Sequence, residues 1–386
     1  MLMVVSESSG RTQTVAEVAR DLSLNLKYFA DGEALTRALQ HRTRRIVLLA
    51  DGDIDPQTLD VLAACEDDQP FGLIVAADHE GLRVSQRAEL FDRLNGFGDV
   101  EWIGADHDVE TLCDAARNCR RRMLKISQQE LEDALRNDEL IVQYQPKVER
   151  SNGEEWLTRE AEALLRWRHP VHGVVGPLDF LPEVEAFGMI GRVSEYVLRE
   201  AARQLVVWRE QGLELNSCIN LAPSLLGRHT LADDYEAIVA EYGLDCASFT
   251  LEVAEHDVAN SDAPHLKVLK GLRAKGFRLS LDDFGVAASS LSTFEQLPFD
   301  EIKIHASALK RAMAGSVHQK VLAAVTGLAH NLGISVCAEG VEDQETFEFL
   351  KTIECDKMQG FLISEAVMPD IVRRVYSSKT NVDEVA

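Results

Sequence analysis

The first part of the chain alternates short apolar runs with longer segments in which apolar residues recur at helical spacing. This alternation predicts a doubly wound α/β domain built on five strands. We place the strands at residues 2–5, 26–29, 45–50, 71–76 and 100–103, with helices around 14–22 and 33–40.

A helical segment is expected to connect this domain to the rest of the chain. Residues 109–122 have helical spacing and end in the basic cluster Arg120-Arg121-Arg122. Ser127 followed by Glu130 has the spacing of a capping box, which predicts a further helix that ends near Leu135.

The remainder of the chain alternates strands and helices again, and its strand count points to a barrel. We expect strands at 140–144, 157–167, 217–221, 249–253, 278–282, 301–304, 335–338 and 358–362. Eight strands with intervening helices are typical of a TIM-like (β/α)8 barrel of about 250 residues. The turn Ser151-Asn152-Gly153 joins the first two strands as a hairpin, so we expect that pair to be antiparallel.

Polar and ionic residues lie at or near the ends of these strands. In a barrel, such ends converge on one mouth. Along the second strand, Glu160, Glu162, Leu164 and Arg166 share one face. The residues expected at the mouth are Gln145, Glu162, Asn220, Glu252, Asp282, Asp283, Lys303, Glu339 and Gln359.

Five carboxylates at one mouth repel one another unless cations neutralise them. Oxygen-only ligands favour Mg²⁺ or Mn²⁺ over zinc. The set therefore suggests hydrolysis of a phosphodiester with two bound ions, with Lys303 supplying further positive charge or orienting the water.

Composition and charge narrow the function classes. With 40 Lys and Arg against 64 Asp and Glu, the net charge is −24, which argues against DNA as the main partner. No apolar run is long enough for a membrane span, and no secretory signal is visible. Seven cysteines without a C-x-x-C pair suit free thiols. We therefore expect a cytoplasmic protein.

An ordered series of short motifs runs through the predicted barrel. Its members are Tyr144-Gln145-Pro146, Glu162-Ala163-Leu164, Ile219-Asn220-Leu221, Leu251-Glu252-Val253-Ala254-Glu255, Asp282-Asp283-Phe284-Gly285, Ile302-Lys303-Ile304, Glu339-Gly340-Val341-Glu342 and Gln359-Gly360-Phe361. Over about residues 130–370 this series resembles the EAL family of cyclic di-GMP phosphodiesterases. The resemblance implies hydrolysis of cyclic di-GMP to linear pGpG, and we also expect a homodimer.

The resemblance also implies a role for each matching residue. One metal ion would be held by Glu162, Asn220, Glu252 and Asp282, and a second by Asp282, Asp283 and Glu339, with Mg²⁺ or Mn²⁺ as the ions. The remaining catalytic matches are Lys303, which contacts the nucleophilic water, Gln359, which supports that site together with Glu339, and Glu255, which anchors the loop after the fifth strand. Gln145, Leu164 and Arg166 match substrate contacts.

Two departures from the family pattern keep a second function open. Residues 286–288 read Val-Ala-Ala where the family commonly has Thr or Ala, Gly and Tyr. His305 replaces an aspartate, and it could ligate a transition ion, act as a base or weaken the second metal site. The alternative is a catalytically degenerate EAL protein that acts as a cyclic di-GMP sensor or as a protein-interaction module.

The N-terminal domain resembles a degenerate, flavodoxin-like receiver domain of response regulators. Its first strand is followed by Glu7 alone instead of an acidic pair, and its fifth strand lacks the lysine. We expect docking to a signalling partner or dimerisation; phosphorylation of Asp51 or Asp53 is the alternative. The predicted organisation is a receiver-like domain (1–122), a helical linker (123–136), an EAL barrel (137–378) and a disordered tail (379–386).

Overall fold

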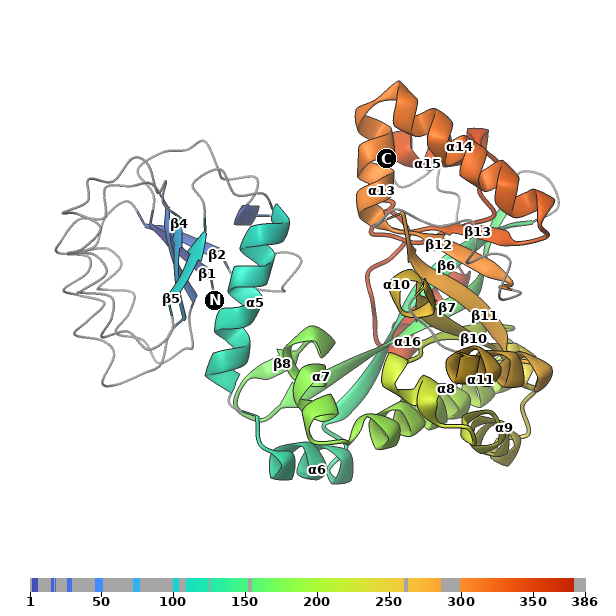
Figure 1. Cartoon of the computed structure of the whole chain (residues 1–386), viewed down its shortest axis with the longest axis horizontal. Coiled ribbons are helices and arrows are strands. Elements are labelled where there is room, and N and C mark those ends of the chain that lie inside the picture. Colours follow the sequence, from blue (N-terminus) through green and yellow to red (C-terminus); the bar gives the residue numbers. More distant parts are fainter. Residues whose placement is uncertain are drawn as a thin grey trace. The chain divides into compact units, whose positions relative to one another are not determined.

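The computed structural model describes residues 2–5, 15–16, 18, 26–29, 46–50, 72–76, 100–103, 109–124, 126–151, 155–259, 263–285 and 299–377 (Figure 1). The chain divides into two compact units. One contains residues 1–139 and 167–183, and the other contains residues 140–166 and 184–386.

The N-terminal unit contains a sheet of five parallel strands in the order β2-β1-β3-β4-β5. The strands are β1 (Leu2–Val5), β2 (Leu26–Phe29), β3 (Ile46–Ala50), β4 (Gly72–Ala76) and β5 (Val100–Ile103), each within one residue of its predicted bounds. This is the strand order of flavodoxin-like folds. Most of the two predicted helices, Glu7, Asp51 and Asp53 lie outside the described residues, so the receiver-like domain stays a prediction.

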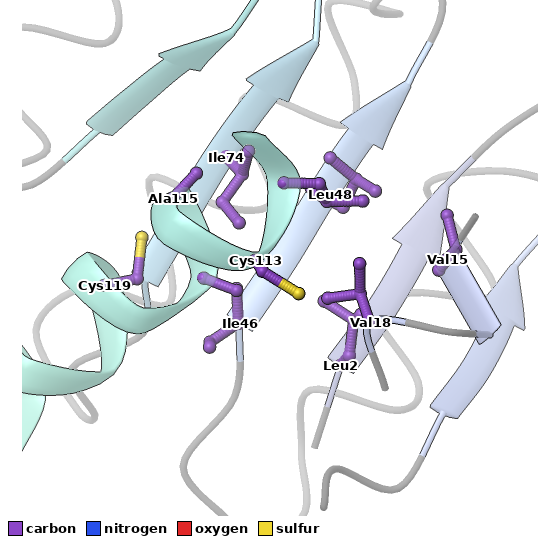
Figure 2. Packing of buried hydrophobic residues seen from close by; sticks show 11 residues of the cluster. Leu2, Val15, Val18, Ile46, Leu48, Ile74, Cys113, Ala115 and Cys119 are labelled. Carbon is purple, nitrogen blue, oxygen red and sulfur yellow. The ribbon is translucent and has the colours of Figure 1, made fainter. Parts of the chain in front are cut away.

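Helix α5 (Val109–Leu124) packs its apolar face on this sheet (Figure 2). Leu112, Ala116 and Cys119 recur at helical spacing, so they lie on one side of the helix. They form one buried cluster with residues that include Leu2 and Ile74. Burial of this face holds the helix against the sheet.

Helix α6 (Gln128–Arg136) begins with the predicted capping box. The Glu130 amide donates to Ser127 Oγ at 3.3 Å, and the Ser127 amide donates to Glu130 Oε2 at 2.9 Å. The sequence pattern thus located the start of this helix correctly, and its end lies one residue beyond the expected one.

The second sheet closes into a barrel. Its order is β6-β14-β13-β12-β11-β10-β9-β7-β8, and a further pairing of β6 with β7 joins the two sides. The eight barrel strands are β6 (Leu140–Ser151), β7 (Glu155–His169), β9 (Asn216–Asn220), β10 (Phe249–Ala254), β11 (Arg278–Phe284), β12 (Glu301–Ile304), β13 (Ser335–Ala338) and β14 (Lys357–Met358).

The first strand of the barrel runs against all the others. Strands β7 and β9 to β14 pair in parallel with their neighbours, whereas β6 is antiparallel to β14. Strand β6 is therefore also antiparallel to β7, as the hairpin predicted. The short strand β8 (Gly173–Val175), which the sequence pattern did not predict, pairs with the end of β7.

Helices follow the strands of the barrel. They are α7 (Pro177–Ala186), α8 (Ile190–Glu210), α9 (Leu231–Glu241), α10 (Glu255–Ala259), α11 (Ala263–Ala274), α13 (Ala306–Ala314), α14 (Ser316–Asn331), α15 (Gln344–Thr352) and α16 (Pro369–Ser377), with the 3₁₀ turns η2 (Pro223–Gly227) and η3 (Cys246–Ser248). In α8, Val197, Ala201, Leu205 and Trp208 form a buried stripe. No helix in the described part of the chain has the length and apolar character to cross a membrane.

Candidate active site

The barrel brings the charged face of β7 inward. Glu160 and Glu162 are both buried, at 2% and 6% exposure, although carboxylates are rarely buried unless they are paired. Because side chains alternate along a strand, the same face continues to Leu164 and Arg166. The four-residue alternation seen in the sequence thus directs two carboxylates into the barrel and two further side chains toward the end of the strand.

The Lys303 ammonium lies among four carboxylates that come from four different strands or strand ends. Lys303 Nζ is 2.7 Å from Glu339 Oε1, 3.0 Å from Glu252 Oε2, 3.4 Å from Glu162 Oε2 and 3.4 Å from Asp282 Oδ1. One cation opposite four potential anions leaves the cluster with excess negative charge. Such a cluster attracts further cations.

Amide side chains complete the surroundings of Glu162. Asn220 Nδ2 donates to Glu162 Oε1 at 3.0 Å, and Gln359 Nε2 donates to Glu162 Oε2 at 2.8 Å. Gln359 Nε2 is also 2.8 Å from Gln145 Oε1. Gln359 Oε1 is buried with no hydrogen-bond partner among the described residues. This acceptor faces no protein donor, so it suits a bound water or ligand.

The glycine after Gln359 permits a close approach of two backbone segments. A Cβ at position 360 would lie 2.2 Å from Val341 O, so only glycine fits there. The Val341 amide donates to Gln359 O at 3.1 Å. This contact holds the segment after Glu339 beside Gln359.

Burial and mutual repulsion raise the pKa of two of the carboxyl groups. Burial raises the pKa of Glu252 to about 7, with a further contribution from Glu162. Burial likewise raises the pKa of Asp282 to about 6, aided by Glu339. Burial by itself would raise the pKa of Glu162, but Lys303, Lys147 and the two amides lower it to about 2. The carboxyl group of Glu162 thus ionises well below neutral pH, whereas those of Asp282 and Glu252 lose their protons only as the pH approaches neutrality.

This protonation predicts a pH-dependent affinity for divalent cations. Cation binding requires ionised carboxylates, so protons leave Glu252 and Asp282 as the ion binds. We expect the affinity for Mg²⁺ to increase from about pH 6 to about pH 8 and then to level off. Calorimetry in buffers of different ionisation enthalpy measures the proton release. An affinity and proton count that stay constant over this range would contradict the assignment.

Asp283 and Glu255 lie beside the cluster. Asp283 has φ +59, a conformation that Asp tolerates better than most residues, and the β11–β12 register shifts between Leu281 and Phe284. This irregularity breaks the alternation at two successive carboxylates. Glu255, the first residue of α10, accepts from the Gly285 amide at 3.5 Å. Residues 286–288 lie outside the described residues.

His305 caps a helix. The Ser307 amide donates to His305 Nδ1 at 3.1 Å at the start of α13. A neutral imidazole that accepts at Nδ1 carries its proton on Nε2, which is 3.9 Å from Asp283 Oδ1. In this arrangement Nδ1 serves the start of α13, and the three roles considered for His305, as ligand, as base or as a replacement that weakens the second metal site, stay predictions.

The predicted substrate contacts lie at the end of β7 and near the start of β6. Leu164 and Arg166 are half-buried, and Arg166 Nη1 donates to Leu165 O at 2.9 Å. Burial lowers the pKa of Arg166, although Glu162 opposes the shift. Gln145 Nε2 donates to Ser364 O at 3.0 Å. Arg166, the charged residue of the three, has no ion pair among the described contacts.

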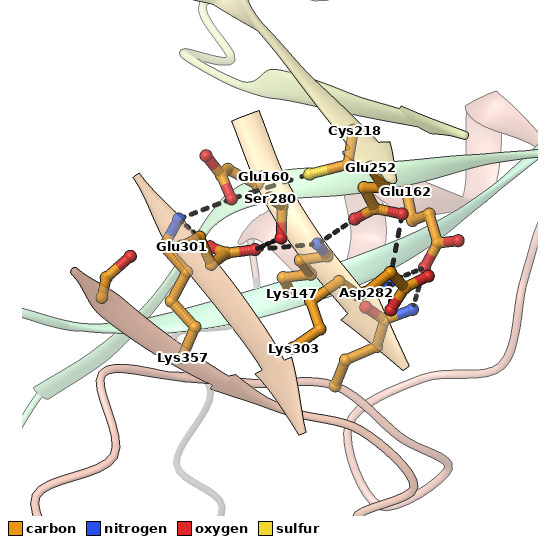
Figure 3. A network of polar contacts seen from close by, with 12 residues as sticks. Lys147, Glu160, Glu162, Cys218, Glu252, Ser280, Asp282, Glu301, Lys303 and Lys357 are labelled. Atoms are coloured by element: carbon orange, nitrogen blue, oxygen red, sulfur yellow. Dashed lines mark hydrogen bonds and ion pairs between the residues drawn. The ribbon is translucent and has the colours of Figure 1, made fainter. Parts of the chain in front are cut away.

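Four further charged residues in the barrel were not predicted as part of a site. Lys147, Glu160, Glu301 and Lys357 form a second network beside the Lys303 cluster (Figure 3). Each lies two residues along the chain from a predicted mouth residue, namely Gln145, Glu162, Lys303 and Gln359. The strand alternation could therefore have revealed them.

The donor set fits hard divalent cations in its chemistry. All the candidate ligands present oxygen, which Mg²⁺ and Mn²⁺ prefer. Among the described residues, no three His, Cys, Asp or Glu side chains already surround one ion position. Instead, the Lys303 ammonium lies between the carboxylates, so an ion held by several of them would require Lys303 and the carboxylates to shift.

Comparison with known proteins identifies the family. A family model for the EAL domain matches residues 128–366. The cyclic di-GMP phosphodiesterase NbdA of Pseudomonas aeruginosa is 36% identical over 238 residues, which are 61% of this chain and 30% of NbdA. The cyclic di-GMP phosphodiesterase PdeR of Escherichia coli is 31% identical over 246 residues, 64% of this chain and 37% of PdeR. The chain spans about a third of the length of these relatives.

Solved structures agree with this match. The PaMucR phosphodiesterase in complex with c-di-GMP aligns with TM-score 0.58 and 34% identity, over 63% of this chain and 98% of that one. An EAL domain protein from Listeria monocytogenes aligns with TM-score 0.57 and 26% identity, over 66% of this chain and 98% of that one. With its closed barrel and its ordered series of motifs, the chain belongs to the EAL domain family.

Proposed function

We propose that this chain hydrolyses cyclic di-GMP to linear pGpG at the mouth of its EAL barrel. The single observation that carries the proposal is the buried Lys303 ammonium surrounded by Glu162, Glu252, Asp282 and Glu339. A pure binding site for a nucleotide with two phosphates has no need of four converging carboxylates, because they repel the ligand. The relatives named as phosphodiesterases support the same reaction.

Each side chain has a proposed task. Glu162, Asn220, Glu252 and Asp282 would hold one Mg²⁺ or Mn²⁺ ion, and Asp282, Asp283 and Glu339 a second. When bound, such ions activate a water and stabilise the leaving oxygen. Lys303 orients the water, and the buried, unpaired Oε1 of Gln359 accepts a hydrogen bond from the same water and holds it in position.

Other residues bind the nucleotide and fix the loop. Arg166 supplies a guanidinium suited to a phosphate or a guanine edge, and Gln145 and Leu164 complete the contact. Glu255 holds the backbone at Gly285. In the reaction, the water loses a proton as its oxygen bonds to phosphorus, the bond from phosphorus to the ester oxygen breaks, and the departing oxygen takes up a proton, so one of the two phosphodiester linkages is opened.

The test is hydrolysis of cyclic di-GMP by the purified chain with Mg²⁺ or Mn²⁺, followed by chromatography for pGpG. Product that appears with the metal and not with EDTA supports the proposal. Intact nucleotide binding without product would favour the alternative of a degenerate EAL sensor. The absence of both would favour a protein-interaction module.

We also propose a homodimer formed through α14. Residues 302–338 contain no Asp or Glu, although 64 of the 386 residues in the chain are acidic. Val317, Val321, Leu328 and Leu332 are exposed along this stretch, with Val317 at 69%. Two chains of net charge −24 repel each other, so a second copy approaches most easily at a face that is apolar and free of carboxylates.

If α14 forms the dimer interface, a single substitution on its apolar face should halve the mass of the assembly in solution. Val321→Glu places a charge on the apolar face of α14, and we expect sedimentation to show a monomer where the unmodified chain is a dimer. Val171→Glu is the matched control, because Val171 is 74% exposed in the turn between β7 and β8. Equal masses for the two variants would contradict the assignment of α14.

For the N-terminal domain we propose regulation of the barrel through docking to a signalling partner. The parallel sheet in the order β2-β1-β3-β4-β5 supports a receiver-like fold. Acetyl phosphate treatment followed by mass spectrometry distinguishes this from phosphorylation. Added phosphate on Asp51 or Asp53 would replace the docking proposal with a phosphorylation switch.

A further inference from the structure

The buried charges of the barrel fall into two groups with different neighbours (Figure 3). The mouth group contains Lys303 and its four carboxylates. The lower group contains Lys147, Glu160, Glu301 and Lys357, which belong to no motif that the proposed function uses. The lower group is buried, as are Lys303, Glu162 and Glu252 of the mouth group, so the charges of these residues interact strongly, whereas Asp282 and Glu339 are half-buried.

The lower group balances its own charge. Lys357 Nζ is 2.7 Å from Glu160 Oε2 and 2.7 Å from Glu301 Oε2. Lys147 Nζ is 3.7 Å from Glu301 Oε1. Two lysines thus face two carboxylates, and the partly exposed Arg278 adds a contact of 3.5 Å to Glu160. No cation is required here, in contrast to the mouth group.

Lys147 is the link between the two groups. Its Nζ is 2.7 Å from Glu252 Oε1, and both side chains are at most 1% exposed. The other oxygen, Glu252 Oε2, is 3.0 Å from Lys303 Nζ. The two lysines therefore occupy different oxygens of one carboxylate. Lys303 also contacts three other mouth carboxylates, whereas Glu252 is the only mouth carboxylate with a described ion pair to Lys147.

We propose that Lys147 is a positioning residue for Glu252. Its ammonium binds Oε1 on the side of the lower group and leaves Oε2 as the oxygen presented to the mouth. The inference rests on the proposed metal-dependent hydrolysis, in which Glu252 is a ligand. Because Lys147 keeps its partner in the lower group, it stays in place when Lys303 moves. Glu252 then presents one oxygen in one orientation, and no second rotamer competes with it.

The experiment is titration of the full chain with Mn²⁺, followed by electron paramagnetic resonance of the free ion. Lys147→Met removes the ammonium and keeps the length of the side chain. We expect its Mn²⁺ affinity to fall by about 10–100-fold, the range seen when a partner of a metal ligand is removed. Lys147→Gln keeps a hydrogen-bond donor for Oε1, so its loss should be smaller.

Lys357→Met is the matched control. It also removes a buried lysine that contacts Glu301, but Lys357 has no described contact with a mouth carboxylate. We expect its Mn²⁺ affinity to stay within about threefold of the unmodified chain, even if it unfolds at a lower temperature. Equal losses in the Lys147→Met and Lys357→Met variants would reduce the role of Lys147 to general stability and overturn the inference.

A measurement on the unmodified chain covers the case in which the variants do not fold. In its crystal structure with Mn²⁺, we expect Lys147 Nζ to remain at hydrogen-bond distance from Glu252 Oε1, with Oε2 alone on the ion. A Glu252 that binds with both oxygens, or that has left Lys147, would overturn the inference. If Mn²⁺ does not bind to the unmodified chain at all, the proposed function fails first, and the inference that rests on it is withdrawn.

Discussion

Replacing Glu162 with glutamine is expected to reduce the hydrolysis of cyclic di-GMP by about 10³-fold, because it removes several kcal/mol of charge stabilisation. Glutamine keeps the size of the side chain and its contact with Asn220, but it removes the negative charge that faces Lys303. Formation of pGpG by the full chain, measured with saturating Mn²⁺, gives the rate. Activity within tenfold of the unmodified chain would exclude Glu162 from the catalytic site.

Glu160→Gln is the matched control for this substitution. Glu160 lies on the same strand and the same face, and it is equally buried. Its ion pair is with Lys357 in the lower group, so it has no part in the mouth. We expect the variant to lose stability but to keep its turnover once the folded fraction is measured by circular dichroism. A loss of turnover as large as that of Glu162→Gln would show that burial alone explains both effects.

Lys303→Met is expected to make the folded state depend on divalent cations. Without this ammonium, four carboxylates face one another, and breaking such a buried pair costs about 3–5 kcal/mol. Mg²⁺ can replace the missing charge, so we expect a large rise in melting temperature when Mg²⁺ is added to the variant and a smaller rise for the unmodified chain. Hydrolysis should remain impaired even with Mg²⁺, because the group that orients the water is absent.

The comparison for Lys303→Met is Lys357→Met. Both variants lose a buried lysine, but the carboxylates left behind by Lys357 are Glu160 and Glu301, away from the mouth. Burial by itself lowers the pKa of Lys303, yet Glu162, Glu252 and Glu339 raise it well above its usual range, so the charge is permanent. If Mg²⁺ restored both variants equally, the stabilisation would come from general ion binding to an acidic chain.

Most of the barrel strands could be predicted from the sequence because short apolar runs and strand-end polar residues have a clear period. The prediction for the last strand, 358–362, was wrong in its bounds, because β14 spans only Lys357–Met358. The turn at 151–153 also indicated the antiparallel start. The extra strand β8 could not be predicted, because Gly173-Val174-Val175 lies in a segment rich in Pro and Gly that also suits a turn. Its pairing with Trp167 and His169 forms a short local hairpin.

The candidate mouth residues lie close together in the structure, but the sequence analysis did not predict the buried ion pairs of the lower group. Motif matching singles out Gln145, Glu162, Lys303 and Gln359 and passes over the residues two positions away. In a barrel, those positions form the next layer of side chains on the same inner face. Lys147 and Glu301 show that ionic residues two positions apart on a barrel strand should be considered together, because they lie on the same inner face.

The role of His305 also required the structure. Sequence comparison presents it as an imidazole in place of a carboxylate near the metals, which suggests ligand or base chemistry. The hydrogen bond from the Ser307 amide shows a different use of the same ring, since a helix start needs an acceptor and Nδ1 provides one.

The reversed direction of β6 sets where the polypeptide enters the barrel. Since β6 is antiparallel to its neighbours, its first residues lie at the same end as the carboxyl ends of the other strands, and Gln145 is only five residues beyond Leu140. A parallel first strand would have placed this entry at the far end. A force on the preceding segment would thus act at the end of the barrel where the candidate mouth residues lie, and it would reach Gln145 through only five residues of strand.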